Sequence, residues 1–102
     1  MELESFTFVL IRSGPRAAEY DGDELEELQA RHLAYLDSLR ERGDLLLAGP
    51  FSDQEDETKR GLGIFRTGVE ETQRVMADDP SVRAGRIAIE AMTWLTPKGS
   101  LD

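Results

Sequence analysis

Four segments of the chain carry the hydrophobic pattern of β-strands. In each, β-branched, aromatic or leucine residues form an unbroken run or alternate with other residues, and glycine, proline or charged residues bound the segment. These segments are 6–12, 44–51, 61–67 and 86–95. The two glycines of 61–67 weaken this strand and indicate a bulge or a close approach of another backbone. We therefore predict four strands, of which the third has the weakest pattern.

Two of the connections between these strands show a hydrophobic period near 3.6 residues, which is typical of amphipathic helices. The first helix is predicted over about 23–42, with Asp23 as its N-cap and Gly43 at its C-terminal end. The second is predicted to begin at a capping box formed by Thr67 and Glu70, and to end before the sequence DDP. One helix thus follows the first strand and the other follows the third.

The predicted order of elements is strand, helix, strand, strand, helix, strand, which is the split βαβ arrangement of ferredoxin-like α+β folds. A one-turn helix over 79–85 precedes the last strand. This topology places both helices on one face of an antiparallel four-stranded sheet. We expect a single domain, residues 1–102, with a core of about 6–97 and a tail at 98–102.

The strands at 6–12 and 44–51 are apolar on both faces, whereas two helices cover only one face of the sheet. An uncovered apolar sheet face is larger than the apolar patches that soluble monomers usually expose. A second copy of the chain is the simplest cover. The pattern therefore predicts a homodimer, or a higher oligomer of dimers.

Composition narrows the classes of partner. With 21 acidic and 12 basic residues the chain has a formal charge of -9, which repels the phosphates of nucleic acids. It has no apolar run that spans a membrane, no recognisable secretory signal at its acidic start, and no cysteine for a disulfide or a thiolate metal site. We therefore expect a cytoplasmic protein that binds neither nucleic acid nor membranes.

Acidic residues gather in two segments, 19–27 and 52–57, which we interpret as solvated faces or loops. The second segment lacks the regular spacing and the central glycine of a calcium-binding loop. We therefore expect no metal site.

His32 is the only histidine of the chain, and it lies in the middle of the apolar arc of the helix 23–42. Its imidazole is the one side chain that ordinarily exchanges protons near neutral pH. Two interpretations are open. In the first, His32 is a neutral core residue whose ring is bonded to a backbone carbonyl or a hydroxyl. In the second, a carboxylate fixes the tautomer of the ring and leaves the other nitrogen free to move a proton on a bound molecule.

Asp79 is the best candidate for that carboxylate, because it lies at a turn between the second helix and the last strand, where site residues often gather. An Asp followed by Pro80 is also typical of a helix N-cap. The two roles are compatible, since a carboxylate has several lone pairs and accepts from an amide and an imidazole together.

The stretches RHLAYLDSLRERGDLLLAGP and ADDPSVRAG, followed by a strand that contains Trp94, resemble the YCII-related (YciI-like) family of small proteins. The resemblance extends over about 6–97. The residues that carry it are His32, Gly43, Gly49, Pro50, Asp79, Pro80, Ala84 and Gly85. It implies a ferredoxin-like fold that pairs into a dimeric α+β barrel, with a His/Asp pair in a pocket carried here by His32 and Asp79.

The absence of a cysteine nucleophile, a GxSxG elbow and a GxxxxGK[ST] loop disfavours covalent acyl chemistry and nucleotide hydrolysis. The reaction class that remains is proton transfer on a small cyclic or carbonyl-bearing metabolite, without a cofactor. In this reaction His32 is the acid or base and Asp79 orients its ring. The candidates for contacts to this molecule are Gly49, Pro50, Ser52 and Arg12. The alternative for Ser52 and Arg12 is that they are ordinary surface residues at the ends of strands.

Two functions are therefore open. One is a cofactor-independent lyase, isomerase or hydrolase that acts by His/Asp acid–base catalysis. The other is a non-catalytic dimeric module that binds a small ligand or a partner protein.

Overall fold

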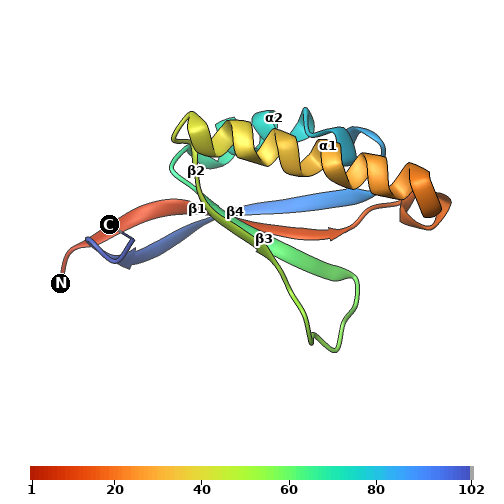
Figure 1. Cartoon of the computed structure of the whole chain (residues 1–102). Coiled ribbons are helices and arrows are strands. Elements are labelled where there is room, and N and C mark those ends of the chain that lie inside the picture. Colours follow the sequence, from red (N-terminus) through yellow and green to blue (C-terminus); the bar gives the residue numbers. More distant parts are fainter. Residues whose placement is uncertain (102) are drawn as a thin grey trace.

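The computed structural model describes residues 1–101 and shows one antiparallel sheet with its helices on one side (Figure 1). The elements are β1 (Leu3–Ser13), the 3₁₀ turn η1 (Ala17–Glu19), α1 (Gly22–Glu41), β2 (Leu45–Pro50), β3 (Lys59–Phe65), α2 (Val69–Ala77), α3 (Pro80–Arg83) and β4 (Ile87–Pro97). The strand order is β2-β3-β1-β4. The predicted ferredoxin-like α+β fold is confirmed.

The hydrophobic core lies between the sheet and the helices, because one face of each amphipathic element points there. Its buried members are Val9, Ile11, Leu36, Leu39, Leu45, Phe65, Val75, Met76 and Ile87. Burying such a side chain contributes about 1.5–3 kcal/mol. The buried stripe of α1 consists of Leu28, His32, Leu36 and Leu39. His32 therefore occupies a core position of the helix, as its place in the predicted arc indicates.

The ends of several elements differ from the sequence prediction. β1 and β4 are longer than expected, because Leu3 pairs with Pro97 beyond the apolar segments that predict the two strands. β3 begins at Lys59 and ends at Phe65, so each end lies two residues earlier in the chain than in the predicted strand 61–67. The N-cap of α1 is Asp21, and the predicted cap Asp23 lies in the first turn of the helix. There its carboxylate still interacts favourably with the helix dipole.

The predicted capping box at Thr67 is wrong. α2 begins at Val69 with Gly68 as its N-cap, and no side chain caps it. The Thr67 carbonyl accepts a hydrogen bond from the Thr7 hydroxyl at 2.6 Å, and the Thr67 hydroxyl is paired with that of Thr72 at 2.7 Å. These contacts tie residue 67 to β1 and to the interior of α2, so its side chain is not available to the first turn.

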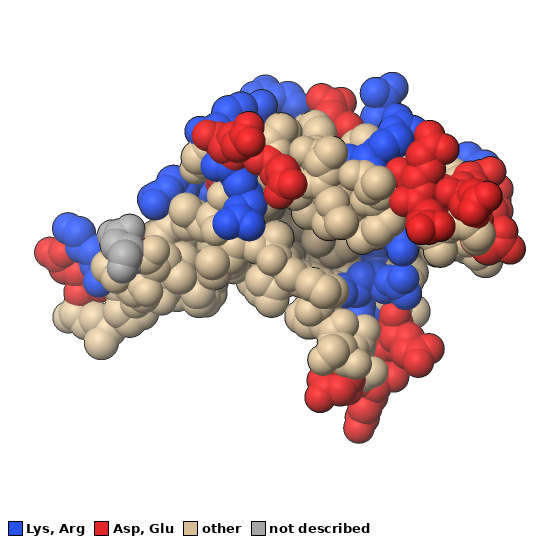
Figure 2. Space-filling view, in the orientation of Figure 1, with Lys and Arg blue, Asp and Glu red and all other residues tan. Residues whose placement is uncertain are grey.

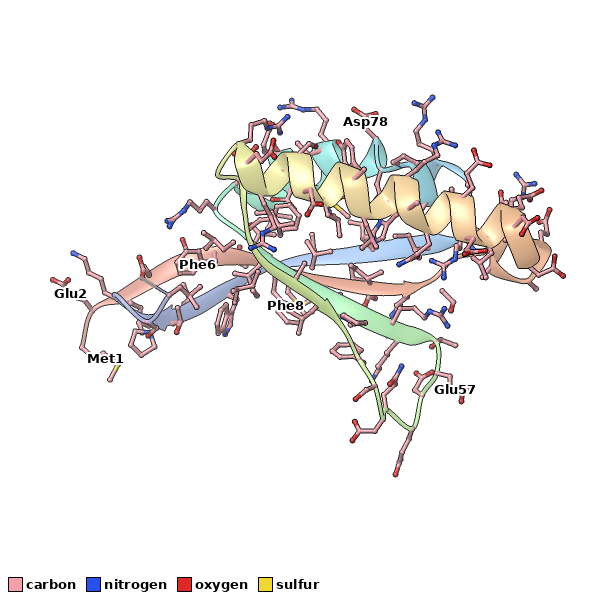
Figure 3. All side chains as sticks on the ribbon, in the orientation of Figure 1. Met1, Glu2, Phe6, Phe8, Glu57 and Asp78 are labelled. Carbon is pink, nitrogen blue, oxygen red and sulfur yellow. The ribbon has the colours of Figure 1, made fainter. Side chains whose placement is uncertain are left out.

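The other face of the sheet is largely apolar, and none of the helices formed by residues 1–101 covers it. The pairings of β1 place Phe8 opposite Ile64 of β3 and Met92 of β4, and Phe6 opposite Trp94. Figure 3 shows Phe8 on the side of the sheet away from the helices. Met92 is 44% exposed and Trp94 is 38% exposed. The described part of the chain therefore leaves an apolar sheet face that is partly exposed to solvent around Met92 and Trp94.

Gly14 and Gly85 bring the end of β1 close to the residue that precedes β4. The Gly14 amide donates to the Arg86 carbonyl at 2.7 Å, and a Cβ added to Gly14 lies 2.4 Å from the Gly85 carbonyl oxygen. Gly85 has a φ of 74°, which a side chain disfavours. The two glycines thereby fix the backbone from which the Arg86 side chain projects.

We expect Gly14→Ala to lower the free energy of unfolding by about 1–3 kcal/mol, because two backbone segments must separate to admit one methyl group. Urea denaturation at a fixed protein concentration measures this loss. Gly49→Ala is the control, since a Cβ there meets nothing within 4 Å. Equal denaturation midpoints for the two variants contradict the prediction.

Candidate functional site

The centre of the site is a hydrogen bond between His32 and Asp79. His32 Nδ1 lies 2.6 Å from Asp79 Oδ2, although the residues are 47 positions apart in the chain. His32 is 7% exposed and Asp79 is fully buried. The partner of the ring is therefore a carboxylate, and not the backbone carbonyl or hydroxyl that a simple core histidine uses.

Asp79 is held in place by the start of α3. Its Oδ1 accepts from the Ser81 amide at 2.8 Å, which caps the helix, and its backbone amide donates to the Met76 carbonyl at 3.1 Å. The predicted cap is confirmed. One carboxylate oxygen thus closes the helix end while the other holds the imidazole.

The contact between the ring and the carboxylate has a chemical consequence for the ring nitrogens. Where the carboxylate is ionised it only accepts hydrogen bonds, and Nδ1 of His32 then carries the hydrogen in this contact. The second ring nitrogen, Nε2, has no hydrogen-bond partner among residues 1–101. In the neutral ring Nε2 holds a free lone pair, and in the charged ring it holds a proton. His32 is therefore arranged to accept or donate a proton at Nε2.

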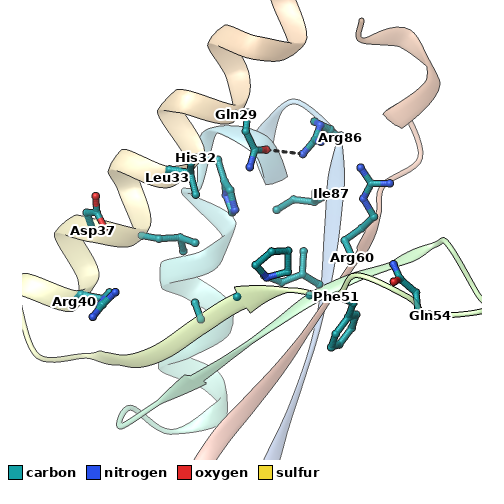
Figure 4. Close-up of a pocket in the computed structure, with 16 residues that line it drawn as sticks. Gln29, His32, Leu33, Asp37, Arg40, Phe51, Gln54, Arg60, Arg86 and Ile87 are labelled. Atoms are coloured by element: carbon teal, nitrogen blue, oxygen red, sulfur yellow. Dashed lines mark hydrogen bonds between the residues drawn. The ribbon is translucent and has the colours of Figure 1, made fainter.

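A pocket of about 610 Å³ opens beside His32, between α1 and the sheet (Figure 4). Figure 4 shows the imidazole pointing from α1 into this space. One face of α1 forms one wall, and the ends of the strands with the β2–β3 hairpin form the other. The lining residues on the sheet side include Ile11, Ala48, Gly49, Pro50, Gly61 and Ile87. Much of the wall is apolar, as in most small-molecule sites.

The four residues predicted to contact a ligand separate into two groups. Gly49 and Pro50 line the pocket. Ser52 and Arg12 are not among the lining residues, and the Arg12 Nε instead forms an ion pair with Glu90 Oε2 at 3.1 Å. Arg12 follows Ile11 in β1, so the alternation of the strand directs its side chain to the opposite face of the sheet.

The hairpin residues that do line the pocket are Phe51 and Gln54. The sequence analysis placed Phe51 at the end of the strand 44–51 and Gln54 in the acidic segment 52–57, and identified neither as a pocket residue. In the structure β2 ends at Pro50, so both residues belong to the connection between β2 and β3. The acidic residues of 52–57 are exposed at the far end of the same hairpin. Figure 2 shows acidic side chains at this tip and at the N-terminal end of α1, with basic side chains in the recess between them.

Polar pocket residues that the sequence analysis missed include Gln29, Arg60 and Arg86. Arg86 Nη1 donates to Gln29 Oε1 at 3.1 Å. Burial lowers the pKa of Arg86, and the positive charge of Arg60 lowers it further. Gln29 lies one helical turn before His32, so the period of α1 was a usable signal for it. Nothing in the local sequence marks the two arginines.

No group of three or more His, Cys, Asp or Glu side chains within residues 1–101 is arranged to hold a metal ion. None of the helices in this part of the chain is long and apolar enough to cross a membrane.

The fold and the site together define a small ferredoxin-like α+β protein with a buried histidine–carboxylate pair beside a pocket. Comparison with known families identifies it further. The chain belongs to the YCII-related domain family, whose model matches residues 6–94. The resemblance noted in the sequence is thereby confirmed.

Two solved structures resemble this one. The 5-chloro-2-hydroxyhydroquinone dehydrochlorinase of Burkholderia phenoliruptrix, in complex with 2,5-dihydroxybenzoquinone, is 19% identical with a TM-score of 0.53, and the match covers 89% of this chain and 91% of that one. A mutant of SnoaB, a cofactor-independent oxygenase of Streptomyces nogalater, is 14% identical with a TM-score of 0.49, covering 95% and 96% of the two chains. No curated protein sequence matches this chain significantly.

Proposed function

We propose that this protein is a cofactor-independent enzyme that uses His32 and Asp79 for acid–base catalysis on a small metabolite. The observation that carries the proposal is the 2.6 Å contact between His32 Nδ1 and Asp79 Oδ2, which leaves Nε2 without a partner beside the pocket. The reaction classes that need only such a pair are those of a lyase, an isomerase or a hydrolase.

In this mechanism Asp79 orients the ring and stabilises the imidazolium that forms when Nε2 accepts a proton. His32 then returns the proton to another atom of the same molecule or to a leaving group. The backbone at Gly49 and Pro50 forms the wall opposite α1. A volume of about 610 Å³ is within the range of small-ligand sites.

The proposed enzyme is a homodimer. The apolar sheet face around Phe8, Met92 and Trp94 supports this, because a second copy covers such a face most simply. Pairing of this kind forms the dimeric α+β barrel that the family resemblance implies.

The test begins with a search for a ligand. Hydroxylated quinones are the first compounds to try, since the dehydrochlorinase from Burkholderia phenoliruptrix was solved with 2,5-dihydroxybenzoquinone. Lactones and other small carbonyl compounds follow. Compounds that raise the melting temperature of the protein bind its folded state, and each is then assayed for turnover.

We expect His32→Asn to remain folded and to lower the turnover of any substrate found in this way by about 10²- to 10⁴-fold. The Asn amide preserves a donor toward Asp79 but removes Nε2. Arg31→Gln is the control on the same helix, since Arg31 is exposed and does not line the pocket. Undiminished turnover in His32→Asn contradicts the proposed role. Ligands that bind without any turnover support the non-catalytic binding module instead.

A further inference from the structure

One end of the pocket holds two arginines that converge from different elements. Arg60 lies in β3, Arg86 lies immediately before β4, and both line the pocket. Figure 4 shows the two side chains at the same end of the pocket, with Gln29 of α1 bonded to Arg86. The lowered pKa of Arg86, to which the charge of Arg60 contributes, also reflects their proximity.

Neither guanidinium is neutralised by a carboxylate in the described part of the chain. Within residues 1–101, no recorded ion pair joins Arg60 or Arg86 to a carboxylate, and the hydrogen-bond partner of Arg86 is the neutral amide of Gln29. Other arginines of the chain do have acidic partners, and these pairs are Arg12–Glu90, Arg16–Glu19, Arg42–Asp44 and Arg74–Glu71. The chain has 21 acidic residues, so partners are abundant elsewhere.

Two like charges at one end of a partly apolar pocket raise the energy of the empty site. A planar oxyanion offsets this cost, because guanidinium groups bind carboxylate oxygens in pairs of charge-assisted hydrogen bonds. The side-chain amide of Gln29 holds Arg86 in place for such a contact.

We infer that Arg60 and Arg86, with Gln29, form a subsite for a planar oxyanion, such as a carboxylate, of the molecule on which His32 acts. The inference rests on the proposed function only in that His32 and the subsite serve the same ligand. Gln29 precedes His32 by three residues on one face of α1, a rise of about 4.5 Å along the helix. A ligand anchored at the arginines therefore lies in the same pocket as the imidazole and extends toward it.

Benzoate and benzamide provide the test, because they have nearly the same shape and differ in charge. Binding is measured by titration of the whole protein, followed by backbone amide NMR. We expect benzoate to bind more tightly than benzamide and to shift the amide signals of Gln29, His32 and Arg86. Raising the salt concentration should weaken the binding of benzoate only.

The double variant Arg60→Gln and Arg86→Gln should weaken benzoate binding by about tenfold or more and leave benzamide binding unchanged. Arg83→Gln is the control, since Arg83 is exposed at the end of α3 and does not line the pocket. Arg60→Gln alone serves as the second variant if the double variant fails to fold, because Arg60 is exposed.

Equal affinities of the wild-type protein for benzoate and benzamide, absence of benzoate binding, or unchanged benzoate binding in the arginine variants each overturns the inference. The outcome is separable from that of the proposed function. Benzoate binding that depends on the arginines, in a protein that turns nothing over, supports the subsite and contradicts the enzyme. Turnover that depends on His32 but not on the arginines contradicts the subsite alone.

Discussion

His32→Leu is expected to lower the free energy of unfolding by about 3–5 kcal/mol, the usual cost of removing one partner of a buried pair. Asp79 is fully buried, and within residues 1–101 its side chain has two hydrogen-bond partners, the His32 ring and the Ser81 amide. Leucine fills most of the space of the ring but offers no donor. The carboxylate is then left with one hydrogen bond in an interior that solvates charge poorly.

A double-mutant cycle isolates the contribution of the pair. We expect the loss in His32→Leu combined with Asp79→Ala to be smaller than the sum of the two single losses, because the unpaired carboxylate is absent from the double variant. Urea denaturation at one fixed protein concentration gives all four free energies, since association affects apparent stability. His32→Asn, which keeps a donor toward Asp79, should retain most of the stability.

The competing interpretation makes the opposite prediction. If the ring only fills the core, leucine is tolerated or stabilising at position 32, because volume-conserving apolar replacements cost little. Additive losses in the cycle, or a His32→Leu variant as stable as the wild-type protein, contradict a coupled pair.

The fold was predictable because its signals are local. A strand alternates and a helix repeats its apolar residues every three to four positions, so each segment shows which residues face the core. The place of His32 in the buried stripe of α1 follows from this period alone. Asp79 was also identifiable, although it is 47 residues from His32. An Asp before Pro80 is typical of a helix N-cap, and the start of the helix fixes the position of the Asp79 carboxylate.

The arginine subsite was not predictable in the same way. Arg60 reaches one end of the pocket from β3 and Arg86 reaches it from the residue just before β4, and their meeting depends on how the sheet lies against α1. Long polar side chains follow no hydrophobic period. The capping box predicted at Thr67 is wrong for a similar reason, because contacts between distant or neighbouring elements are not visible in the local sequence. Hydrogen bonds to Thr7 and Thr72 replace the cap that the local sequence favours.

Met92→Lys is expected to convert the proposed homodimer into a monomer. Met92 lies on the uncovered sheet face, pairs with Phe8 of β1 and is 44% exposed in the single chain. A lysine at the centre of an apolar interface loses water around its charge and gains no partner. We expect the dissociation constant of the dimer to rise at least about a hundredfold, equivalent to about 2.8 kcal/mol.

Sedimentation analysis over a range of protein concentrations measures this constant directly. Gln73→Lys is the charge-matched control, since Gln73 is exposed on α2, on the helical side of the sheet. It should associate as tightly as the wild-type protein. Circular dichroism separates loss of association from loss of folding, because a monomer that retains its helices and sheet has lost only the interface.

The result also bears on the pocket. The β2–β3 hairpin supplies Phe51 and Gln54 to the site, and β2 also contributes Leu47, which is 51% exposed and pairs with Ile64 on the apolar face. A copy seated on that face therefore restrains the strand that forms the pocket wall. We expect the monomeric Met92→Lys variant to bind benzoate more weakly than the Gln73→Lys control. A wild-type protein that sediments as a monomer at micromolar concentration, with its pocket fully able to bind, contradicts both the dimer and this coupling.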